Sequence, residues 1–195
     1  MPFQFYFVLI VLLLMNGCGG HKRVVYPVCK VVPVPHAAPK IDNEIKQHYL
    51  TAVNKMRSQS RICGSKTYRA VKPLKWNSTL YSAAYEHSKD MAESAHFSHY
   101  GSGTKNDWTA KTQKLSSCST FVNRIENNGY IRHLGIAENI AYGMRTVDEV
   151  MQQWITSKGH CANIMNPAFT DIGMAQVKGD SGSYYWTQTF GSTIP

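Results

Sequence analysis

Two pairs of residues in this sequence have side chains and spacings that could do chemistry. Ser157 and His160 are three positions apart, and a nearby histidine could activate the serine hydroxyl as a nucleophile. However, no nucleophile-elbow sequence surrounds Ser157, no oxyanion-hole element is apparent, and serines at helix ends commonly bond to backbone groups. His96 and His99 are also three apart and could share a helix face as a local two-histidine metal site. The pattern favours a binding protein over an enzyme.

The other conspicuous ring side chains fit structural roles. His87 lies on the apolar stripe of a predicted helix, which predicts a buried histidine with one backbone partner. Trp76, Trp154 and Trp186 occupy patterned positions and are predicted core aromatics. Trp108 lies in a polar stretch and is the better candidate for a surface contact.

The chain has five cysteines, at positions 18, 29, 63, 118 and 161. The odd number becomes an even four if Cys18 carries lipid, and four cysteines in an oxidising compartment can form two disulfides. Three pairings are possible and the sequence does not choose among them. Of these we favour Cys29 with Cys63 and Cys118 with Cys161. No Cys-x-x-Cys pair is present, which argues against zinc bound by cysteines alone.

The N-terminus has the character of an export signal. Residues 3–15 are apolar apart from Gln4, and this stretch is too short to span a bilayer comfortably, so it predicts a signal sequence. Met15-Asn16-Gly17-Cys18 resembles the bacterial lipoprotein signal, although Met15 and Asn16 are not the favoured residues and no Lys or Arg precedes them. We expect residues 1–17 to be removed and Cys18 to be lipidated, with an ordinary cleaved signal as the alternative.

Residues 18–40 predict an anchor and a spacer rich in Pro and Val. If this stretch is largely polyproline-like, it could reach about 60 Å and hold a domain clear of a membrane. The net charge is +9 and residues 1–17 carry none of it, so the mature protein is basic. Basic residues are scattered without a nucleic-acid-binding motif, so we expect anionic lipid or cell-wall polymer as partners and no nucleic acid.

Periodicity and helix-boundary residues predict the elements that must position these side chains. The first helix begins at Asp42 or Asn43 and has an apolar stripe of Ile45, Tyr49, Val53 and Met56. The other predicted elements are a helix after Trp76-Asn77-Ser78 with the small residues Ala83 and Ala84, a short helix over 121–128, a strand over 135–143, a helix with a capping box at Thr146–Glu149 that stops at Gly159, and a hairpin of 171–178 with 184–190. These elements predict one α+β domain over residues 41–195, a three-layer α-β-α sandwich with a central antiparallel sheet.

Seven segments in this order resemble the CAP superfamily of cysteine-rich secretory, antigen 5 and pathogenesis-related proteins, and especially its bacterial branch. They cover almost the whole predicted domain and are VNKMR at 53–57, LKWN at 74–77, FSHYG at 97–101, residues 121–130 with Arg124-Ile125, AENIAYG at 137–143, residues 154–164 with SKGH at 157–160, and YWTQTF at 185–190. The resemblance implies the CAP fold, also called the SCP fold.

The resemblance also implies a central cleft lined by two histidines and two acids, which holds a divalent metal in several members. The histidines correspond to His99 and His160 and one acid to Glu138, while Ser157 stands where the second acid is expected. His99, Glu138 and His160 would then hold Zn²⁺ or another divalent metal, with water completing the shell. The alternative is a hydrogen-bonded polar cluster without metal.

These observations predict an exported, membrane-tethered protein of the bacterial envelope, facing the periplasm or the surface, or otherwise secreted. Its expected role is a non-enzymatic ligand-binding or host-interaction module, and no residue is assigned as catalytic. Two alternatives remain open. The first is a metal-dependent hydrolase of cell-wall or peptide substrates that uses Glu138 or Ser157. The second is a lipid-binding protein that uses an apolar groove between helices.

Overall fold

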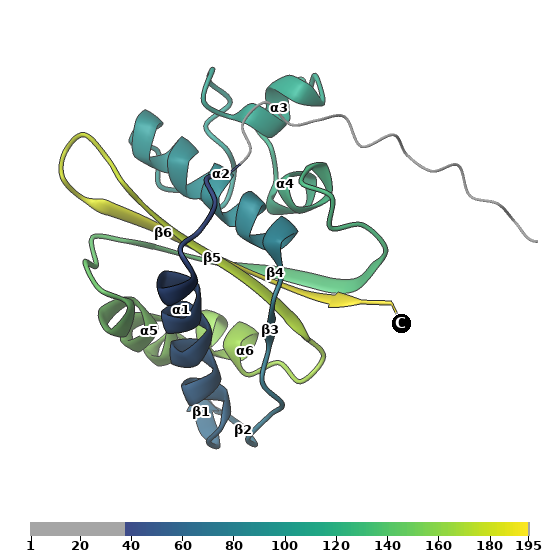
Figure 1. The fold of residues 1–195 in the computed structure, drawn as a ribbon, viewed down its shortest axis with the longest axis vertical. Helices are drawn as coiled ribbons and strands as arrows, with labels where there is room; N and C mark the ends of the chain where they lie inside the picture. Colours follow the sequence, from purple (N-terminus) through teal and green to yellow (C-terminus); the bar gives the residue numbers. More distant parts are fainter. Residues whose placement is uncertain (1–37, 195) are drawn as a thin grey trace, which may run out of the picture. The chain divides into compact units, whose positions relative to one another are not determined.

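A computed structural model describes residues 38–194 of the chain (Figure 1). The helices are α1 (Asn43–Arg57), α2 (Ser78–Ser94), α3 (Trp108–Thr112), α4 (Phe121–Asn127), α5 (Val147–Thr156) and α6 (Lys158–Ile164), and the strands are β1 (Arg61–Cys63), β2 (Lys66–Tyr68), β3 (Lys75–Trp76), β4 (His133–Tyr142), β5 (Asp171–Lys178) and β6 (Tyr184–Thr193). None of the helices in this part of the chain is long and apolar enough to cross a membrane. The predicted signal, Cys18, Cys29 and nearly all of the predicted spacer lie outside the described residues.

The main sheet has the strand order β3-β5-β6-β4. β5 and β6 form the predicted hairpin, and β4 pairs with β6 in antiparallel register, with Glu138 opposite Thr189. The two-residue β3 adds a short parallel pair to β5, and β1 and β2 form a separate two-stranded hairpin. The central antiparallel sheet is therefore confirmed, and β4 lies at one edge of it.

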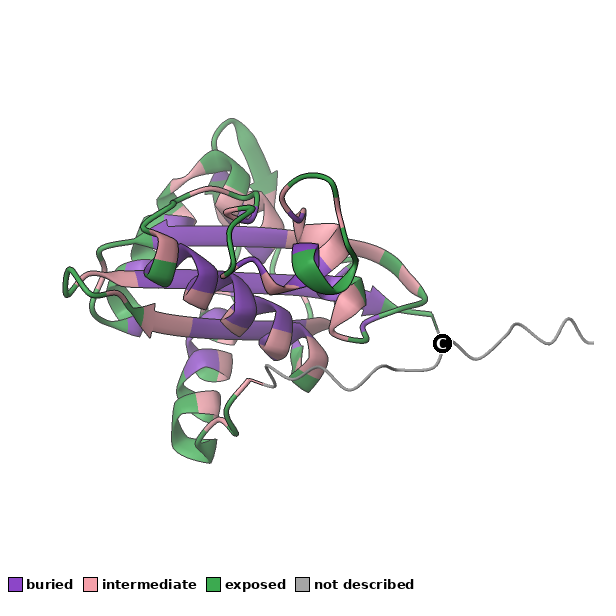
Figure 2. Cartoon of the chain, turned by 90° about the horizontal axis from the view of Figure 1, so that it is seen from above, coloured by how far each residue is buried: buried purple, intermediate pink, exposed green. Residues whose placement is uncertain are grey.

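Helices cover both faces of this sheet, which confirms the α-β-α sandwich. α2 and α4 lie on one face, and α1, α5 and α6 lie on the other (Figure 1). Alternate residues of β6 point to opposite layers, as the period of a strand requires: Trp186 packs in the core with α1 and α5, while Thr187 bonds to Ser88 of α2. Figure 2 shows the strands buried along much of their length between these helices.

α2 approaches the sheet closely because small residues line the contact. Ala83 and Ala84 are buried, as the sequence predicts. A Cβ on Gly173 of β5 would overlap the backbone of Leu80 and Tyr81, so this position requires glycine. Thr189 Oγ1 donates to Leu80 O at 2.9 Å and fixes the helix over the strand. This packing sets the position of every α2 side chain above the sheet.

Local sequence signals placed most element starts correctly. Asp42 caps α1 by accepting from Glu44 N at 2.7 Å, and Thr146 and Glu149 form the predicted capping box of α5. The predicted stop at Gly159 is wrong. α5 ends at Thr156, and Gly159 lies inside α6, a helix that the sequence analysis did not predict.

The favoured disulfide pairing is also wrong. Cys63 at the end of β1 is bonded to Cys161 of α6, with the two Cα atoms 5.4 Å apart. Cys118 is a free thiol in the loop before α4, on the other side of the sheet from α6, so it could not reach Cys161. Cys29, the other predicted partner, falls in the part of the chain that is not described.

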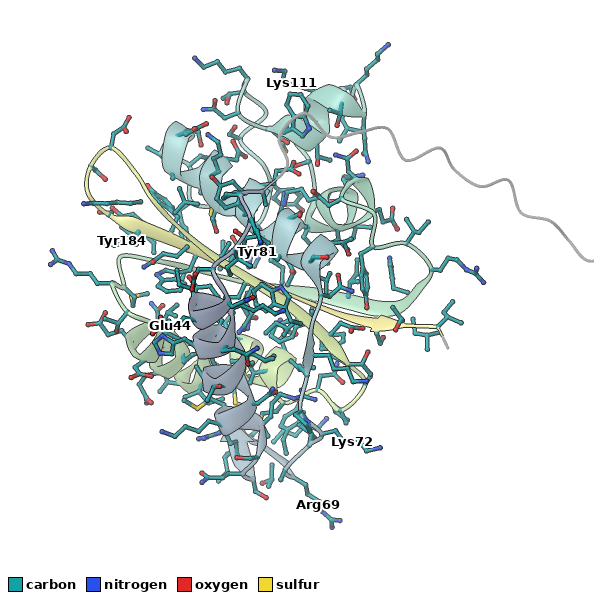
Figure 3. All side chains as sticks on the ribbon, viewed as in Figure 1. Glu44, Arg69, Lys72, Tyr81, Lys111 and Tyr184 are labelled. Atoms are coloured by element: carbon teal, nitrogen blue, oxygen red, sulfur yellow. A yellow bond between two sulfur atoms is a disulfide. The ribbon has the colours of Figure 1, made fainter. Side chains whose placement is uncertain are left out.

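The predicted roles of the aromatic residues hold with one refinement. Trp154 and Trp186 are fully buried, and Trp76 is partly buried against the same core. Trp108 begins α3 and is partly buried rather than lying in an open loop. Lys111, labelled in Figure 3, places its Nζ 5.3 Å from the centre of the Trp108 ring.

Candidate functional site

The centre of the candidate site is a buried ion pair between Glu138 and Arg124. Glu138 lies on β4 and points toward the layer formed by α2 and α4, where its side chain is 1% exposed. Arg124 Nη2 donates to both carboxylate oxygens, at 3.2 Å to Oε1 and 2.9 Å to Oε2. The guanidinium is itself buried, so the charges compensate each other away from water.

Arg124 also fixes the loop that carries His99. Its Nη2 donates to His99 O at 2.9 Å, and its Nη1 donates to the carbonyl and hydroxyl of Ser119, both at 3.2 Å. Asp90 and Asp107 hold the same loop by accepting backbone bonds from Ser102 N and Ser119 N, at 2.7 and 2.8 Å. The loop is therefore fixed by buried polar groups rather than by an apolar core.

His99 meets Glu138 as the resemblance implied. Its Nδ1 lies 2.9 Å from Glu138 Oε1, while the rest of the ring remains accessible, with a side chain that is 48% exposed. The predicted helix-face pair of His96 and His99 is wrong, because α2 ends at Ser94. Ala95 takes a left-handed conformation with φ of 53°, which turns the chain away from the helix axis.

The ion pair determines the protonation state of Glu138. Burial alone would raise the pKa of this carboxyl, but the nearby positive charge of Arg124, the neighbouring His87 and the hydrogen bonds from His99 and Arg124 lower it to about 2. Glu138 is therefore a carboxylate at neutral pH.

His87 is the buried histidine that its place on the helix stripe predicted. It is fully buried, and its Nε2 donates to Ser98 O at 2.8 Å. Its Nδ1 is buried without a hydrogen-bond partner among the described residues, so a proton there would gain no acceptor. Burial, with the positive charge of Arg124, lowers the pKa of His87 to about 3.

Acid should destabilise the fold through His87. In the unfolded chain His87 binds a proton below its ordinary pKa of 6.5, whereas in the folded chain it does so only below about pH 3. The stability of the fold therefore falls as the pH falls between these two values. Between pH 6.5 and 4 we expect the free energy of unfolding of the native protein to fall by about 3 kcal/mol more than that of His87→Gln. The figure follows from about 1.4 kcal/mol for each pH unit over which only the unfolded chain binds the proton. Urea unfolding of both proteins across this range measures the difference.

The variant isolates the histidine because it keeps every other titratable group, and the pKa of Glu138, which His87 helps to lower, is about 2 and so lies below this pH range. Parallel losses in His87→Gln and the native protein would show that His87 is not the group that couples folding to acid.

A cavity of about 510 Å³ opens beside His99 and Glu138. Its walls come from the His99 loop, the start of α4, the edge of β4 and α6. The lining residues are His99, Tyr100, Thr120, Phe121, Val122, Ile136, Ala137, Glu138 and Asn163. We call this cavity the edge cleft. Its volume falls in the range of small-ligand sites, and it combines apolar walls with a polar floor.

Ser157 and His160 do not line the edge cleft. Ser157 lies at the junction of α5 and α6, where its side chain makes no capping hydrogen bond. His160 is on α6, in the layer opposite to the Glu138 side chain, and Asn139 Nδ2 donates to its carbonyl at 3.2 Å. Burial, with a smaller contribution from the nearby His99, lowers the pKa of His160.

The residues present do not fit a divalent metal. Both oxygens of Glu138 accept from Arg124, and the ring nitrogen of His99 that faces the carboxylate is already bonded to it. A guanidinium thus occupies the position next to the carboxylate where a cation would have to bind. Within residues 38–194, no group of three His, Cys, Asp or Glu side chains is arranged to hold a metal ion.

The role of Arg124 was not predicted from the sequence. This residue was noted as part of a family motif, but its charge was not assigned to the cleft. The available signal was a basic residue in a short helix whose neighbours Phe121 and Ile125 are apolar, a position where arginine is buried only with a partner. Asn163 was missed similarly. Its Nδ2 donates to Asn139 Oδ1 at 2.9 Å and helps to close the cleft.

A three-layer α-β-α sandwich with a polar cleft between its loops and the sheet edge defines the class of CAP-domain, or SCP-domain, proteins. The chain belongs to the cysteine-rich secretory protein family, whose model matches residues 50–190. This is a family of extracellular proteins, and one bacterial relative is itself described as extracellular.

Individual relatives agree with this assignment. The protein YkwD of Bacillus subtilis is 36% identical over 122 residues, a match that covers 63% of this chain and 40% of YkwD. An outer surface protein of Borrelia burgdorferi has the same fold, with a TM-score of 0.57 and 18% identity over 79% of this chain and 97% of that one. An extracellular SCP-domain protein of Bacillus anthracis aligns with a TM-score of 0.53 and 24% identity, over 75% of this chain and 40% of its own. The chain thus spans well under half of YkwD and of the Bacillus anthracis protein.

Proposed function

We propose that this protein is an exported, membrane-tethered CAP-domain module that binds a component of the bacterial envelope in the edge cleft without chemically changing it. The observation that carries this proposal is the cleft itself, an open cavity of about 510 Å³ beside a buried and fully compensated ion pair. Such a pair makes a rigid floor, and rigid, preformed cavities are typical of binding sites.

The tether rests on the sequence. The apolar stretch before Cys18 has the length of an export signal, and the residues around Cys18 resemble a lipoprotein signal. The net charge of +9 favours approach to anionic envelope components. Basic side chains are spread over the domain, with Arg69 and Lys72 at one end and Lys111 at the other (Figure 3). This distribution supports general attraction to a polyanionic surface rather than a single docking patch.

The hydrolase alternative has less support. Ser157 and His160 make no hydrogen bond to each other among the described residues, and Glu138 is a carboxylate whose two oxygens are held by Arg124. A general base needs a free lone pair that faces the substrate. The lipid-binding alternative is supported by the apolar walls of the edge cleft, which are formed by Phe121, Val122 and Ile136.

Sedimentation with isolated bacterial envelopes tests the proposal. A Cys18→Ala protein, which lacks the proposed anchor, should still co-sediment with envelopes through the edge cleft. Adding Val122→Trp, which places a larger side chain in the cleft and leaves both residues of the ion pair unchanged, should weaken this retention about tenfold or more, because a blocked cavity loses its contacts. The matched control is Ile62→Trp on β1, an exposed position outside the cleft, which should change nothing.

Three results would separate the candidate functions. Retention that Val122→Trp leaves unchanged would overturn the cleft as the binding site. Release of soluble wall fragments or peptides during incubation would favour the hydrolase. Equal retention on vesicles made from the extracted lipids alone would favour the lipid-binding alternative.

A further inference from the structure

One wall of the edge cleft is the free edge of β4. β4 is the last strand in the sheet order, so no strand of residues 38–194 neighbours its outer side. Gly143 N donates to Tyr184 O at 2.8 Å, and the register of β4 with β6 continues unbroken from there to Ile136. Antiparallel ladders alternate, so the odd-numbered residues of β4 bond to β6 and the even-numbered ones turn their amide and carbonyl outward.

Other parts of the domain cover this edge at one end. Trp154 Nε1 donates to the outward carbonyl of Ile140 at 3.0 Å. Asn163 Nδ2 reaches the outward carbonyl of Glu138 at 3.4 Å, which is a long hydrogen bond. No hydrogen bond from another described residue reaches the amide or carbonyl of Ile136. The edge is therefore open at Ile136, which lines the cleft beside Glu138.

The geometry points to an extended peptide as the ligand of the edge cleft, bound as an additional strand along β4. This inference rests on the proposed binding function and names its ligand class. An exposed strand edge with unpaired backbone groups pairs readily with another extended chain. The adjacent apolar walls of Phe121 and Val122 provide a place for the side chain of one peptide residue.

The charge of the site also limits which side chain the bound peptide residue can have. Arg124 already balances the carboxylate of Glu138 at 2.9 Å, so this ion pair offers no net charge to a ligand. A charged side chain placed there would lose its hydration without gaining a partner. The complementary peptide residue is therefore uncharged and apolar, with backbone amides on both sides that pair with β4.

Fluorescence anisotropy with a short labelled peptide of alternating Val and Thr, capped by Lys at both ends, tests this ladder. Two further forms carry N-methyl groups on the Val amides or on the Thr amides, which removes the donors of one peptide edge at a time. The unmodified peptide should bind, and one of the two methylated forms should bind about tenfold or more weakly, because two lost hydrogen bonds correspond to that factor. Equal binding of all three peptides would overturn the inference.

A pair of protein variants tests the same edge. Ile136→Pro removes the outward amide of Ile136 but no bond to β6, and proline is tolerated at such edge positions. It should weaken peptide binding about tenfold, whereas Ile136→Ala keeps the amide and should weaken it less. If Ile136→Pro unfolds in a thermal melt, the methylated peptides still decide the question.

The outcomes separate this inference from the proposed function. Envelope retention that depends on Val122, combined with no peptide binding at millimolar concentration, overturns the peptide and leaves the proposed function intact. If envelope retention does not depend on Val122 and the peptide also fails to bind, both the proposed function and the peptide inference are overturned. A dimer in light scattering that Ile136→Pro dissociates would assign the edge to a second copy of the chain and overturn the peptide as its occupant.

Discussion

Replacing Arg124 with methionine is expected to lower the free energy of unfolding by about 3 to 5 kcal/mol, because it leaves the buried Glu138 carboxylate without its counter-charge. Methionine keeps the apolar stem, so the loss reports the guanidinium rather than a cavity. The carbonyl of His99 also loses its bond from Arg124, and the carbonyl of Ser119 keeps only the bond from Gly101 N. Urea unfolding at neutral pH measures the change.

Two further variants make this result specific. Arg69→Met, at the exposed Arg69 labelled in Figure 3, removes an equal charge from the surface and should change stability by less than about 0.5 kcal/mol. The double variant Arg124→Met with Glu138→Gln removes both charges and should be more stable than Arg124→Met alone. An Arg124→Met protein as stable as the Arg69→Met control would contradict the ion pair as a structural element.

Removal of the disulfide is the second change with a large expected effect. Cys63 and Cys161 are 98 residues apart in sequence, so their bond closes a long loop in the unfolded chain. We expect the double variant Cys63→Ala and Cys161→Ala to lose about 4 kcal/mol, since the stabilisation grows with the length of the closed loop. Urea unfolding under non-reducing conditions gives the value.

The free thiol provides the matched control for this experiment. Cys118→Ala removes a cysteine that makes no disulfide in the structure and should cost less than about 1 kcal/mol. Peptide mapping of the native protein should recover Cys63 joined to Cys161. A peptide that joins Cys118 to either of them would contradict the structure.

Much of the architecture could be predicted from local sequence signals. Asp42, Thr146 and Glu149 satisfy the amide groups that every helix start leaves unpaired, so they mark the beginnings of α1 and α5. The two runs over 171–178 and 184–190, with the glycine-containing loop between them, predicted the hairpin of β5 and β6. These signals act within a few residues, where sequence and structure are directly linked.

The predictions that failed depend on packing between distant segments. Gly159 was expected to stop a helix, but Ser157 breaks the helix earlier by taking an extended conformation with ψ of 128°, and a new helix follows. Arg57, at the end of α1, is completely buried because carbonyls of Lys72 and Ile164 accept from its guanidinium. No periodic pattern marks a buried arginine, since its partners lie far away in the chain.

The residues of the candidate site also fall into those that could be predicted and one that could not. The resemblance to the family placed His99 and Glu138 in one cleft, and the structure brings them within hydrogen-bond distance. What motif matching could not provide is the identity of the cation beside Glu138. That cation is Arg124, which belongs to a different motif and is brought to the carboxylate only when α4 packs against the sheet. Motifs name residues, but the charge balance of a site follows from the fold.

The bond between Cys63 and Cys161 has a mechanical consequence. A domain held by its N-terminus receives any pull first at α1, and the chain reaches Cys63 soon after that helix ends. From there a covalent link passes directly to α6, whose Asn163 lines the edge cleft. Tension between an N-terminal anchor and a ligand in the cleft would therefore travel across the disulfide and bypass the intervening helices and strands. Only the part of the domain before Cys63 and the short segment from Cys161 to the cleft would have to keep their folded positions under this tension by noncovalent contacts alone.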